Sequence, residues 1–584
     1  MTIQDLIELL GGLGLFLYGM SLMGTGLKAV AGGKLQIILE KLSSTPFRGL
    51  LLGTAVTAVI QSSSATTVMV VGFVNSGIMK LSQAIGVIMG ANIGTTATGW
   101  ILSLAGIQDG AIKPTDLAPV IVLIAAIVIM FAKDFKKKQI ASICLGFSVL
   151  MWGMSFMSHA ADPLAEMPEF TSLLTLFSNP LFGILAGAVM TAIIQSSSAT
   201  VGILQALSVT GTLTYSTCIP IIIGMDIGAC VPVLISSIGA NKNGKRTALI
   251  YLLFNLIGSI VFMICLYSVN IFVQFSFMNA PATATGIAVV NTVFKIFAAA
   301  VLLPLTHKLE ALVKWMVKDS SGTKNSKHKR DITEILDERF FTNPGYAVQQ
   351  CKRVVDRMAE LANENITKAI KQLYEYNPQI GKAIIKNEEL TDEYEDKLGT
   401  YLVKLSNQNL TDQDSRDVSK LLHSIGDFER LSDYALNIYK AAEEIHTKKI
   451  NFSEEADKDL ITINSAITEI LQITVEAFTE DSPETAAKVE PLEQVIDIIC
   501  EDLRTGHIER LRKGICTIET GFVFNDLIND YKRISDHCSN IAVCLIRLKD
   551  KDYNTHEYLN KIKNHGDEEF DIMFNDYKLK YLTK

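Results

Sequence analysis

The ten residues Thr57–Thr66 (TAVIQSSSAT) place one amide and three hydroxyls in the middle of an apolar stretch. The motif returns as Thr191–Thr200 (TAIIQSSSAT), so these donors and acceptors occur twice. Hydroxyl, amide and carbonyl oxygens suit a hard monovalent cation such as Na⁺. The free N–H groups and positive dipole at the start of a helix suit an anion. The repeated motif therefore predicts a site that binds an anion and a cation together.

A second polar pattern follows each motif. Gly90 and Gly94 flank Asn92, and Gly224 and Gly228 flank Asp226. Glycines on either side of one polar residue indicate a second break or a close approach of backbone.

Charged side chains are scarce in this half of the chain. Asp226 is the only charged residue between Asn179 and Ala240, and the last apolar stretch contains Lys295. Ionisable residues within membrane segments are costly and are functional candidates by default. Asp226 and Lys295 therefore join the candidate site.

The motif belongs to an internal duplication. The shift that carries Gln61 onto Gln195 also carries Gly53 onto Gly187. Up to about residue 316 the chain consists of long apolar runs, and a spanning helix needs about 20 such residues. We predict a transmembrane domain over 1–316, with one repeat at 5–135 and the other at 140–310. The predicted spans are 5–27, 82–107, 116–132, 140–158, 217–238, 247–269 and 286–305.

The motifs themselves predict two re-entrant helical hairpins, at 46–78 and 178–212. Consecutive serines compete for backbone hydrogen bonds and favour a break, and each remaining arm is too short to cross alone. Small residues can also serve only to pack membrane helices closely. Irregular backbone at membrane depth, however, is tolerated only where it is buried in protein or lines a cavity, which favours the functional interpretation.

The basic loops give the orientation. With the N-terminus outside, residues 28–48, the basic loop 133–138 and the loop 241–246 all fall on the cytoplasmic face, as the positive-inside rule requires. An odd number of spans per repeat inverts the second copy. Inverted repeats with broken helices at the midplane are typical of secondary transporters.

The paired QSSSAT motifs, with GANIGTT after the first, resemble the sodium–phosphate cotransporter family, called type II in animals. The resemblance covers roughly residues 5–310 and implies symport of inorganic phosphate with Na⁺. It implies the following substrate- and ion-binding residues: Gln61, Ser62, Ser63, Ser64, Thr66, Asn92 and Thr95 in the first copy, and Gln195, Ser196, Ser197, Ser198 and Thr200 in the second.

The sequence departs from the family pattern at several places. Asp226 stands where the second copy usually has Asn, Tyr251 replaces a His upstream of Asn255, and Lys295 replaces an Asn. One hypothesis is a buried Asp226–Lys295 ion pair, whose ammonium takes the role of one Na⁺. The other makes Asp226 a direct Na⁺ ligand and Lys295 a neighbour of the phosphate. With Asn255, both residues belong to the predicted binding set.

Beyond a polar linker at 317–336, residues 337–584 are predicted to form a cytoplasmic helical domain. A repeated Arg-x-x-Asp pattern within it predicts two three-helix units. The pattern resembles the PhoU family, which implies metal clusters held by carboxylates and regulation of phosphate handling. The carboxylates are Glu388, Asp392, Glu429 and Asp433 in the first unit, and Glu493, Asp497 and Asp536 in the second. A solvated acidic helix face is the simpler alternative, and Lys532 in place of a Glu weakens the second site.

The predicted fold class is all-α: a polytopic membrane protein with inverted repeats and two re-entrant hairpins, followed by a cytoplasmic bundle of two three-helix repeats. The predicted function is Na⁺-coupled phosphate transport across the cytoplasmic membrane by alternating access, regulated by the PhoU-like domain. A phosphate-binding membrane sensor without net transport is the alternative. Phosphate, Na⁺ and the lipid bilayer are the expected partners, nucleic acid is not, and a homodimer stays open. An enzyme is not expected, because no His or Lys lies near either motif in sequence and no GxSxG elbow occurs.

Overall fold

The structure is a computed structural model. It describes residues 3–31, 38–39, 43, 45–104, 114–132, 134–165, 167, 176–318, 335–547 and 568–582. The chain forms two compact units, the first of which comprises residues 1–330 with 337–346. The sequence placed the boundary at 337, but residues 337–346 pack within the first unit, where Phe340 is fully buried.

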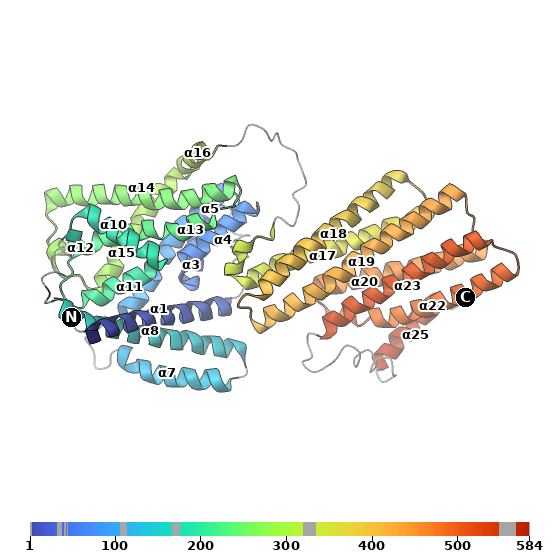
Figure 1. The fold of residues 1–584 in the computed structure, drawn as a ribbon, viewed down its shortest axis with the longest axis horizontal. Coiled ribbons are helices and arrows are strands. Elements are labelled where there is room, and N and C mark those ends of the chain that lie inside the picture. The colour runs from blue at the N-terminus through green and yellow to red at the C-terminus, as the bar shows by residue number, and fades with distance from the viewer. Residues whose placement is uncertain are drawn as a thin grey trace. The chain divides into compact units, whose positions relative to one another are not determined.

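The first unit is helical, and its two copies have matching elements (Figure 1). The first copy comprises α1 (Ile3–Ala31), α3 (Pro46–Ile60), α4 (Ser63–Asn75), α5 (Leu81–Gly94), α6 (Thr96–Ser103) and α7 (Pro114–Phe131). The second comprises α8 (Phe135–Ala165), α10 (Pro180–Ile194), α11 (Ser197–Ser208), α12 (Tyr215–Gly228), α13 (Cys230–Ser236) and α14 (Lys242–Val273). Then follow η2 (Ser276–Asn279), α15 (Ala284–Leu302), η3 (Leu303–Leu305), α16 (Thr306–Met316) and η5 (Glu338–Thr342).

The lengths of the apolar helices match the predicted distinction between spans and hairpin arms except at 116–132. This stretch was predicted to span the membrane, but its apolar helix Asp116–Phe131 belongs with the shorter ones. In the described part of the chain, six helical stretches are long and apolar enough to span a membrane. They are Gln4–Ala31, Leu81–Ser103, Phe135–Ala161, Tyr215–Ser236, Lys242–Val273 and Ala284–Met316. The hairpin arms α3 and α4 have 15 and 13 residues. At 1.5 Å per residue neither arm reaches the ~30 Å of a hydrocarbon core.

One predicted loop is part of a helix. The sequence placed a basic loop at 133–138, but α8 begins at Phe135 and includes its three lysines. The Asp134 carboxylate accepts hydrogen bonds from the backbone N–H groups of Lys136 and Lys137, at 2.7 and 3.3 Å. This N-cap satisfies N–H groups that have no partner in the first turn, so the helix starts earlier.

The leading helices of the two copies, α1 and α8, lie side by side and run antiparallel (Figure 1). A Cβ atom on Gly12 would lie 2.9 Å from the carbonyl oxygen of Gly153, and one on Gly19 would lie 2.6 Å from that of Gly146. Gly12 is the duplicate of Gly146, and Gly19 is the duplicate of Gly153. The contact is therefore nearly the same when the copies are exchanged, as a two-fold relation requires.

Each hairpin's first arm packs on the helix that carries the second break. α3 packs against α5, and α10 packs against α12. A Cβ on Gly90 would come within 2.0 Å of the Leu50 carbonyl oxygen, and one on the equivalent Gly224 within 2.0 Å of the Ile184 oxygen. Only glycine lets the two backbones approach this closely.

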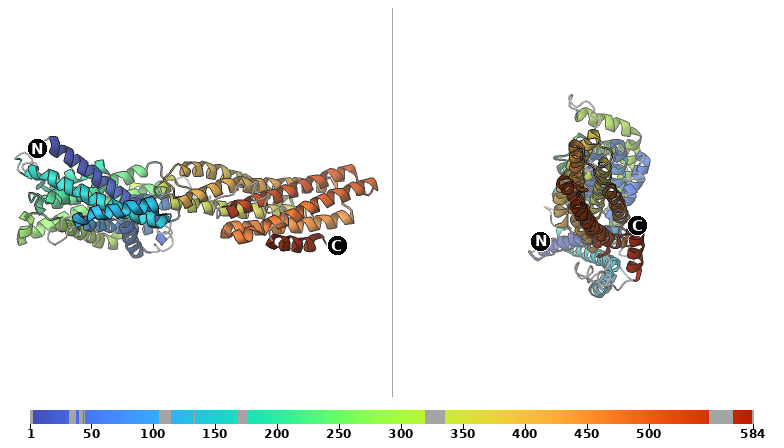
Figure 2. Two further views of the ribbon diagram at one scale, coloured as in Figure 1. Left: turned by 90° about the horizontal axis from the view of Figure 1, so that it is seen from below. Right: turned by 90° about the vertical axis from the view of Figure 1, so that its right-hand side faces the viewer.

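The second unit is a bundle of long helices. Its elements are α17 (Pro344–Gln372, which begins in the first unit), α18 (Pro378–Ser406), α19 (Asp412–Lys448), α20 (Glu454–Glu480), α21 (Pro483–Ala486), α22 (Val489–Arg512), α23 (Ile518–Arg547) and α25 (Glu568–Leu582). α20, α22 and α23 pack on one another, and α25 packs on α22 (Figure 2). The helix α25 is an additional element outside the two predicted three-helix repeats.

We expect Gly90→Ala to destabilise the first unit by roughly 1–3 kcal/mol, because the new methyl group must push α3 from α5. Gly14→Ala is the matched control, since a Cβ there has no neighbour within 4 Å. Thermal unfolding of both purified variants in detergent measures the difference. Equal midpoints for the two variants would contradict the close packing.

A second prediction concerns Asp530 of α23. Burial, and then the neighbouring Asp526, raises the pKa of Asp530 to about 7. A raised acid pKa means that the ionised carboxylate destabilises the folded unit, so stability falls as the pH rises from about 4 through about 7. Asp530→Asn should add on the order of 1–2 kcal/mol to the free energy of unfolding at pH 8, after allowance for partial exposure, and almost nothing at pH 4. Denaturant unfolding at both pH values tests this, and a gain independent of pH would refute the titration.

Candidate functional site

Both QSSSAT motifs break the helix in the same way. α3 ends at Gln61 with φ 60° and ψ 23°, and α10 ends at Gln195 with φ 59° and ψ 22°. This left-handed conformation is uncommon for a residue with a side chain. The backbone N–H of each Gln still donates to the carbonyl of Thr57 or Thr191, at 2.8 and 2.7 Å. The predicted breaks are confirmed, and each begins at the Gln rather than at the serines.

The first serine of each motif starts the next helix. Ser62 and Ser196 are extended N-cap residues, and their hydroxyl oxygens accept from the N–H groups of Ala65 and Ala199 at 3.2 Å. The remaining N–H groups of that first turn belong to the following two serines. Two helices thus begin inside the protein with N–H groups available to an anion.

A threonine pair closes each break. The hydroxyl of Thr57 donates to that of Thr66 at 3.0 Å, and Thr191 and Thr200 lie 2.9 Å apart through their hydroxyls. Thr57 and Thr191 were not among the predicted site residues. Their identical place in both copies of the motif was the signal that could have identified them.

The two breaks differ in their surroundings. Gln61 is buried, and its side-chain oxygen accepts from the Thr98 hydroxyl of α6 at 2.6 Å. Gln195 is exposed, and the nearby Ser198 hydroxyl lies 3.5 Å from the sulfur of Met20. The two breaks therefore differ at the Gln, whereas Ser197 and Ser198 of the second break are buried, as Ser63 of the first is.

The second polar pattern interrupts the helix for a single residue whose backbone stays right-handed helical, so the close backbone approach at Gly90 and Gly224 is its main feature. α5 and α6 are separated at Thr95, and α12 and α13 at the equivalent Ala229. Thr95 is buried, and its hydroxyl donates to the carbonyl of Ala91 at 3.0 Å. Asn92 is also buried, and its amide donates to the Ile88 carbonyl at 3.5 Å.

Asp226 and Lys295 form a buried ion pair. Lys295 Nζ lies 3.1 Å from Asp226 Oδ1, and each side chain is 2% exposed. Among the described residues, neither side chain has a partner with good hydrogen-bond geometry. Burying both charges costs hydration free energy, which their mutual attraction only partly offsets. Removing just one of the two charges is therefore costly, because the other stays buried without a partner.

Polar groups of α14 surround this pair. The Asn255 amide donates to the sulfur of Cys230 at 3.2 Å and to the carbonyl of Tyr251 at 3.1 Å. The fully buried Tyr251 hydroxyl lies close to Ser63 and Asn255. Cys230 Sγ contacts the backbone carbonyl of Asp226 at 3.4 Å. The structure thus brings the first motif and the predicted residues of the second copy together. Cys230 was not predicted, because nothing in the sequence separates it from an ordinary core cysteine.

The helical unit carries two carboxylate clusters. Carboxylate oxygens of Glu388, Asp392 and Asp433 lie within 4.8 Å of one another. Glu429 lies next to them, and burial followed by the charge of Asp433 raises its pKa to about 7. Burial also raises the pKa values of Glu388 and Asp392. Crowded, partly desolvated carboxylates of this kind fit a hard divalent cation.

The second cluster contains a competing cation. Carboxylate oxygens of Glu493, Asp497 and Asp536 also lie within 4.8 Å, but Lys532 Nζ contacts Asp497 at 2.8 Å. The ammonium neutralises part of the charge that a metal ion needs. In the first cluster the cation Arg430 lies farther away, with Nη1 3.5 Å from Asp433 Oδ2. The donor set of the first cluster therefore fits a metal better.

Known families match both units. Residues 15–159 and 149–290 match the Na⁺/Pi-cotransporter family, and residues 355–442 and 461–545 match the PhoU domain. The chain is therefore a multi-pass membrane protein of Na⁺/Pi-cotransporter domains followed by PhoU domains.

Relatives extend the likeness over nearly the whole chain. YjbB of Salmonella typhimurium, whose name proposes inorganic phosphate export, is 22% identical over 95% of this chain and 99% of its own length. Sodium-dependent phosphate transport protein 2A of Rattus norvegicus is 39% identical over 104 residues, 17% of this chain and 16% of that protein. The crystal structure of PhoU from Pseudomonas aeruginosa, 17% identical, covers 34% of this chain and 96% of that protein, with a TM-score of 0.33.

We expect Lys532→Ala to strengthen divalent-cation binding at the second cluster about tenfold, because one positive charge leaves the site. Calorimetric titration of the full-length protein with Mn²⁺ measures the change in affinity. Lys513→Ala, a lysine paired with Glu509 outside both clusters, is the control. Unchanged affinity in Lys532→Ala would show that the cluster is only an acidic surface.

Proposed function

We propose that the protein carries inorganic phosphate across the cytoplasmic membrane, coupled to Na⁺, by alternating access. The observation that carries the proposal is the duplicated break, in which a left-handed Gln ends one helix and a serine starts the next. Helix N-termini and hydroxyls suit the phosphate oxygens, and the carbonyl and hydroxyl oxygens of the breaks suit Na⁺. The printed names of the family and of its relatives support phosphate as the substrate.

The difference between the breaks supports alternating access. Gln61 is buried and Gln195 is exposed, although both have the same backbone conformation. In inverted repeats, an exchange of conformation between the copies would open the first break and close the second. We take the structure as the state in which the second break is accessible, and we place the N-terminus outside and the PhoU domains in the cytoplasm.

The ion pair suggests a modified coupling. The Lys295 ammonium sits 3.1 Å from a carboxylate in a region with a nearby hydroxyl, amide and thiol. We propose that this tethered cation takes the place of one Na⁺, so that fewer Na⁺ ions accompany each phosphate. Direct ligation of Na⁺ by Asp226 is the competing assignment.

The PhoU domains supply the proposed regulation. We propose that occupancy of the Glu388, Asp392 and Asp433 cluster by a divalent cation changes transport. A membrane sensor that binds phosphate without moving it is the second candidate, because the PhoU domains make up a large part of the chain.

Labelled phosphate flux into proteoliposomes separates these functions. We expect flux to follow an imposed Na⁺ gradient of either sign, and Gln61→Ala with Gln195→Ala to reduce it at least about tenfold, since both breaks lose an amide. Empty vesicles and Gln274→Ala are controls, since Gln274 also ends a helix with positive φ but lies outside the motifs. Binding of phosphate without flux in the wild-type protein would favour the sensor.

The ion pair is tested by Asp226→Asn, Lys295→Asn and the double variant. Each single variant leaves one buried charge unpaired, a cost of about 3–5 kcal/mol, and the double variant removes both charges. We expect the double variant to fold and transport better than either single one. Lys295→Asn should also steepen the Na⁺ dependence of the remaining flux. Strictly additive defects would exclude the pair, and direct ligation by Asp226 would then stand.

A further inference from the structure

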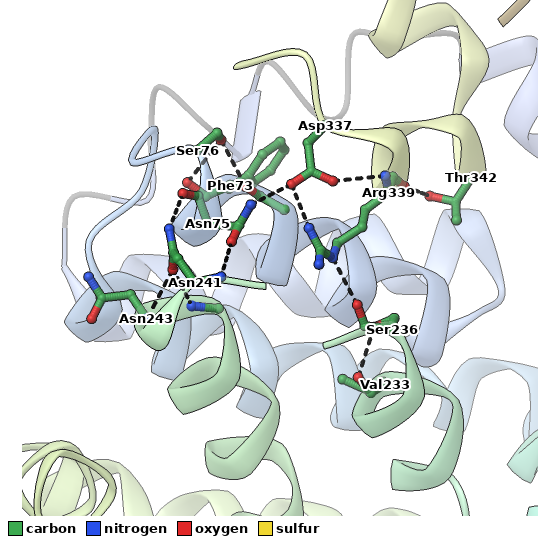
Figure 3. Close-up of polar contacts among 12 residues, drawn as sticks. Phe73, Asn75, Ser76, Val233, Ser236, Asn241, Asn243, Asp337, Arg339 and Thr342 are labelled. Atoms are coloured by element: carbon green, nitrogen blue, oxygen red, sulfur yellow. Dashed lines mark hydrogen bonds and ion pairs between the residues drawn. The ribbon is translucent and has the colours of Figure 1, made fainter. Parts of the chain in front are cut away.

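Residues 337–346 cross from one copy of the duplicated unit to the other. Within this segment lie η5 and the first residues of α17. The segment lies against the end of α4, which is the second arm of the first hairpin, and against α13 of the second copy (Figure 3). The helix α17 starts here at Pro344 and continues into the second unit.

The polar contacts form a continuous chain between the copies. Asp337 Oδ2 accepts from the Asn75 amide at 2.8 Å and from Arg339 Nη1 at 2.7 Å. Arg339 Nε donates to the carbonyl oxygen of Ser236, at the end of α13, at 2.9 Å. Asn75 Oδ1 in turn accepts from the backbone N–H of Asn241 at 2.8 Å. Figure 3 shows Asn75, Asn241 and Ser236 converging on Asp337 and Arg339.

An aromatic contact holds the same segment to α4. Phe340 is fully buried, with its ring centroid 5.5 Å from that of Phe73 and 5.1 Å from that of Tyr346. A Cβ on Gly72 would lie 2.7 Å from the Phe340 ring, so the ring rests directly on the backbone of α4. Charged hydrogen bonds and a buried ring make this a specific attachment rather than a surface contact.

We propose that residues 337–346 act as a clasp that fixes α4 to α13 and keeps the first hairpin closed. The hairpin that the clasp contacts, through α4, is the one whose Gln61 is buried, while Gln195 of the other hairpin is exposed. A bridge between the copies opposes any exchange of their conformations, because that exchange must move α4 relative to α13. Since α17 begins within the clasp, a change in the helical unit has a covalent route to it. The regulatory consequence rests on the proposed transport function, whereas the closure itself does not.

The closure is tested by hydrogen–deuterium exchange of the full-length protein in nanodiscs. We expect Arg339→Ala and Phe340→Ala to raise exchange at residues 57–66 at least about threefold, because the released hairpin opens more often. Residues 191–200 carry nearly the same motif without a clasp and should not change, which makes them an internal control. Phe341→Ala, the half-buried neighbour on η5, is the control variant. A rise confined to residues 72–79 and 335–346 would overturn the proposal.

A charge exchange distinguishes the clasp from simple loss of folding. Asn75→Asp sets two carboxylates side by side and should raise exchange at residues 57–66. Adding Asp337→Asn restores one amide and one carboxylate in the reversed order but removes the Asp337–Arg339 ion pair, so it should bring exchange part of the way back toward wild type. Failure of this rescue, with both variants folded by circular dichroism, would overturn the clasp.

Phosphate flux measured on the same proteins separates the two proposals. An increase of at least about threefold in Arg339→Ala is expected if the clasp restrains transport. Flux equal to or below wild type would overturn the restraint. Absence of Na⁺-dependent flux in every variant would instead refute the proposed function, while the exchange data would still decide whether the clasp closes the hairpin.

Discussion

The need to satisfy backbone polar groups away from water governs the first unit. A helix broken at membrane depth exposes N–H and C=O groups that lipid cannot solvate, so each break must be enclosed by protein or face a polar cavity. At Gln61 and Gln195 the chain retains the final helical hydrogen bond, and the next serine caps the following helix. The N–H groups of a helix's first turn have no partner within the helix, and they are of the kind that a phosphate binds.

Close backbone packing supports this arrangement. Gly90 and Gly224 let the helices with the second break lie directly on the first arm of each hairpin. Where α1 and α8 cross, close contact of the two backbones likewise depends on glycines, namely Gly12, Gly19, Gly146 and Gly153. The glycines thus hold the breaks between rigid helices, and the surrounding structure offsets the cost of the left-handed Gln residues.

The two units differ in how their charged side chains are buried and grouped. In the first, the buried pair of Asp226 and Lys295 lies beside the polar groups of α14 and the first motif. In the second, carboxylates crowd on partly exposed helix faces, where a lysine enters one cluster and not the other. The first arrangement suits a fixed internal cation, and the second suits exchange of a metal ion with solvent.

The sequence by itself determined the duplication, the two hairpins, the polar motifs and the division into apolar and charged halves. These follow from local rules, because apolar length, serine runs and repeated glycines each restrict the backbone without reference to distant residues. The sequence also led to the hypothesis of an Asp226–Lys295 ion pair, since two buried charges of opposite sign attract each other. Tertiary structure alone decided that α8 begins at Phe135, that Tyr251 lies beside Ser63, and that only the first Gln is buried. It also decided that residues 337–346 join the first unit, because Phe340 packs on Phe73, more than two hundred residues earlier in the chain, where no local pattern can indicate the contact.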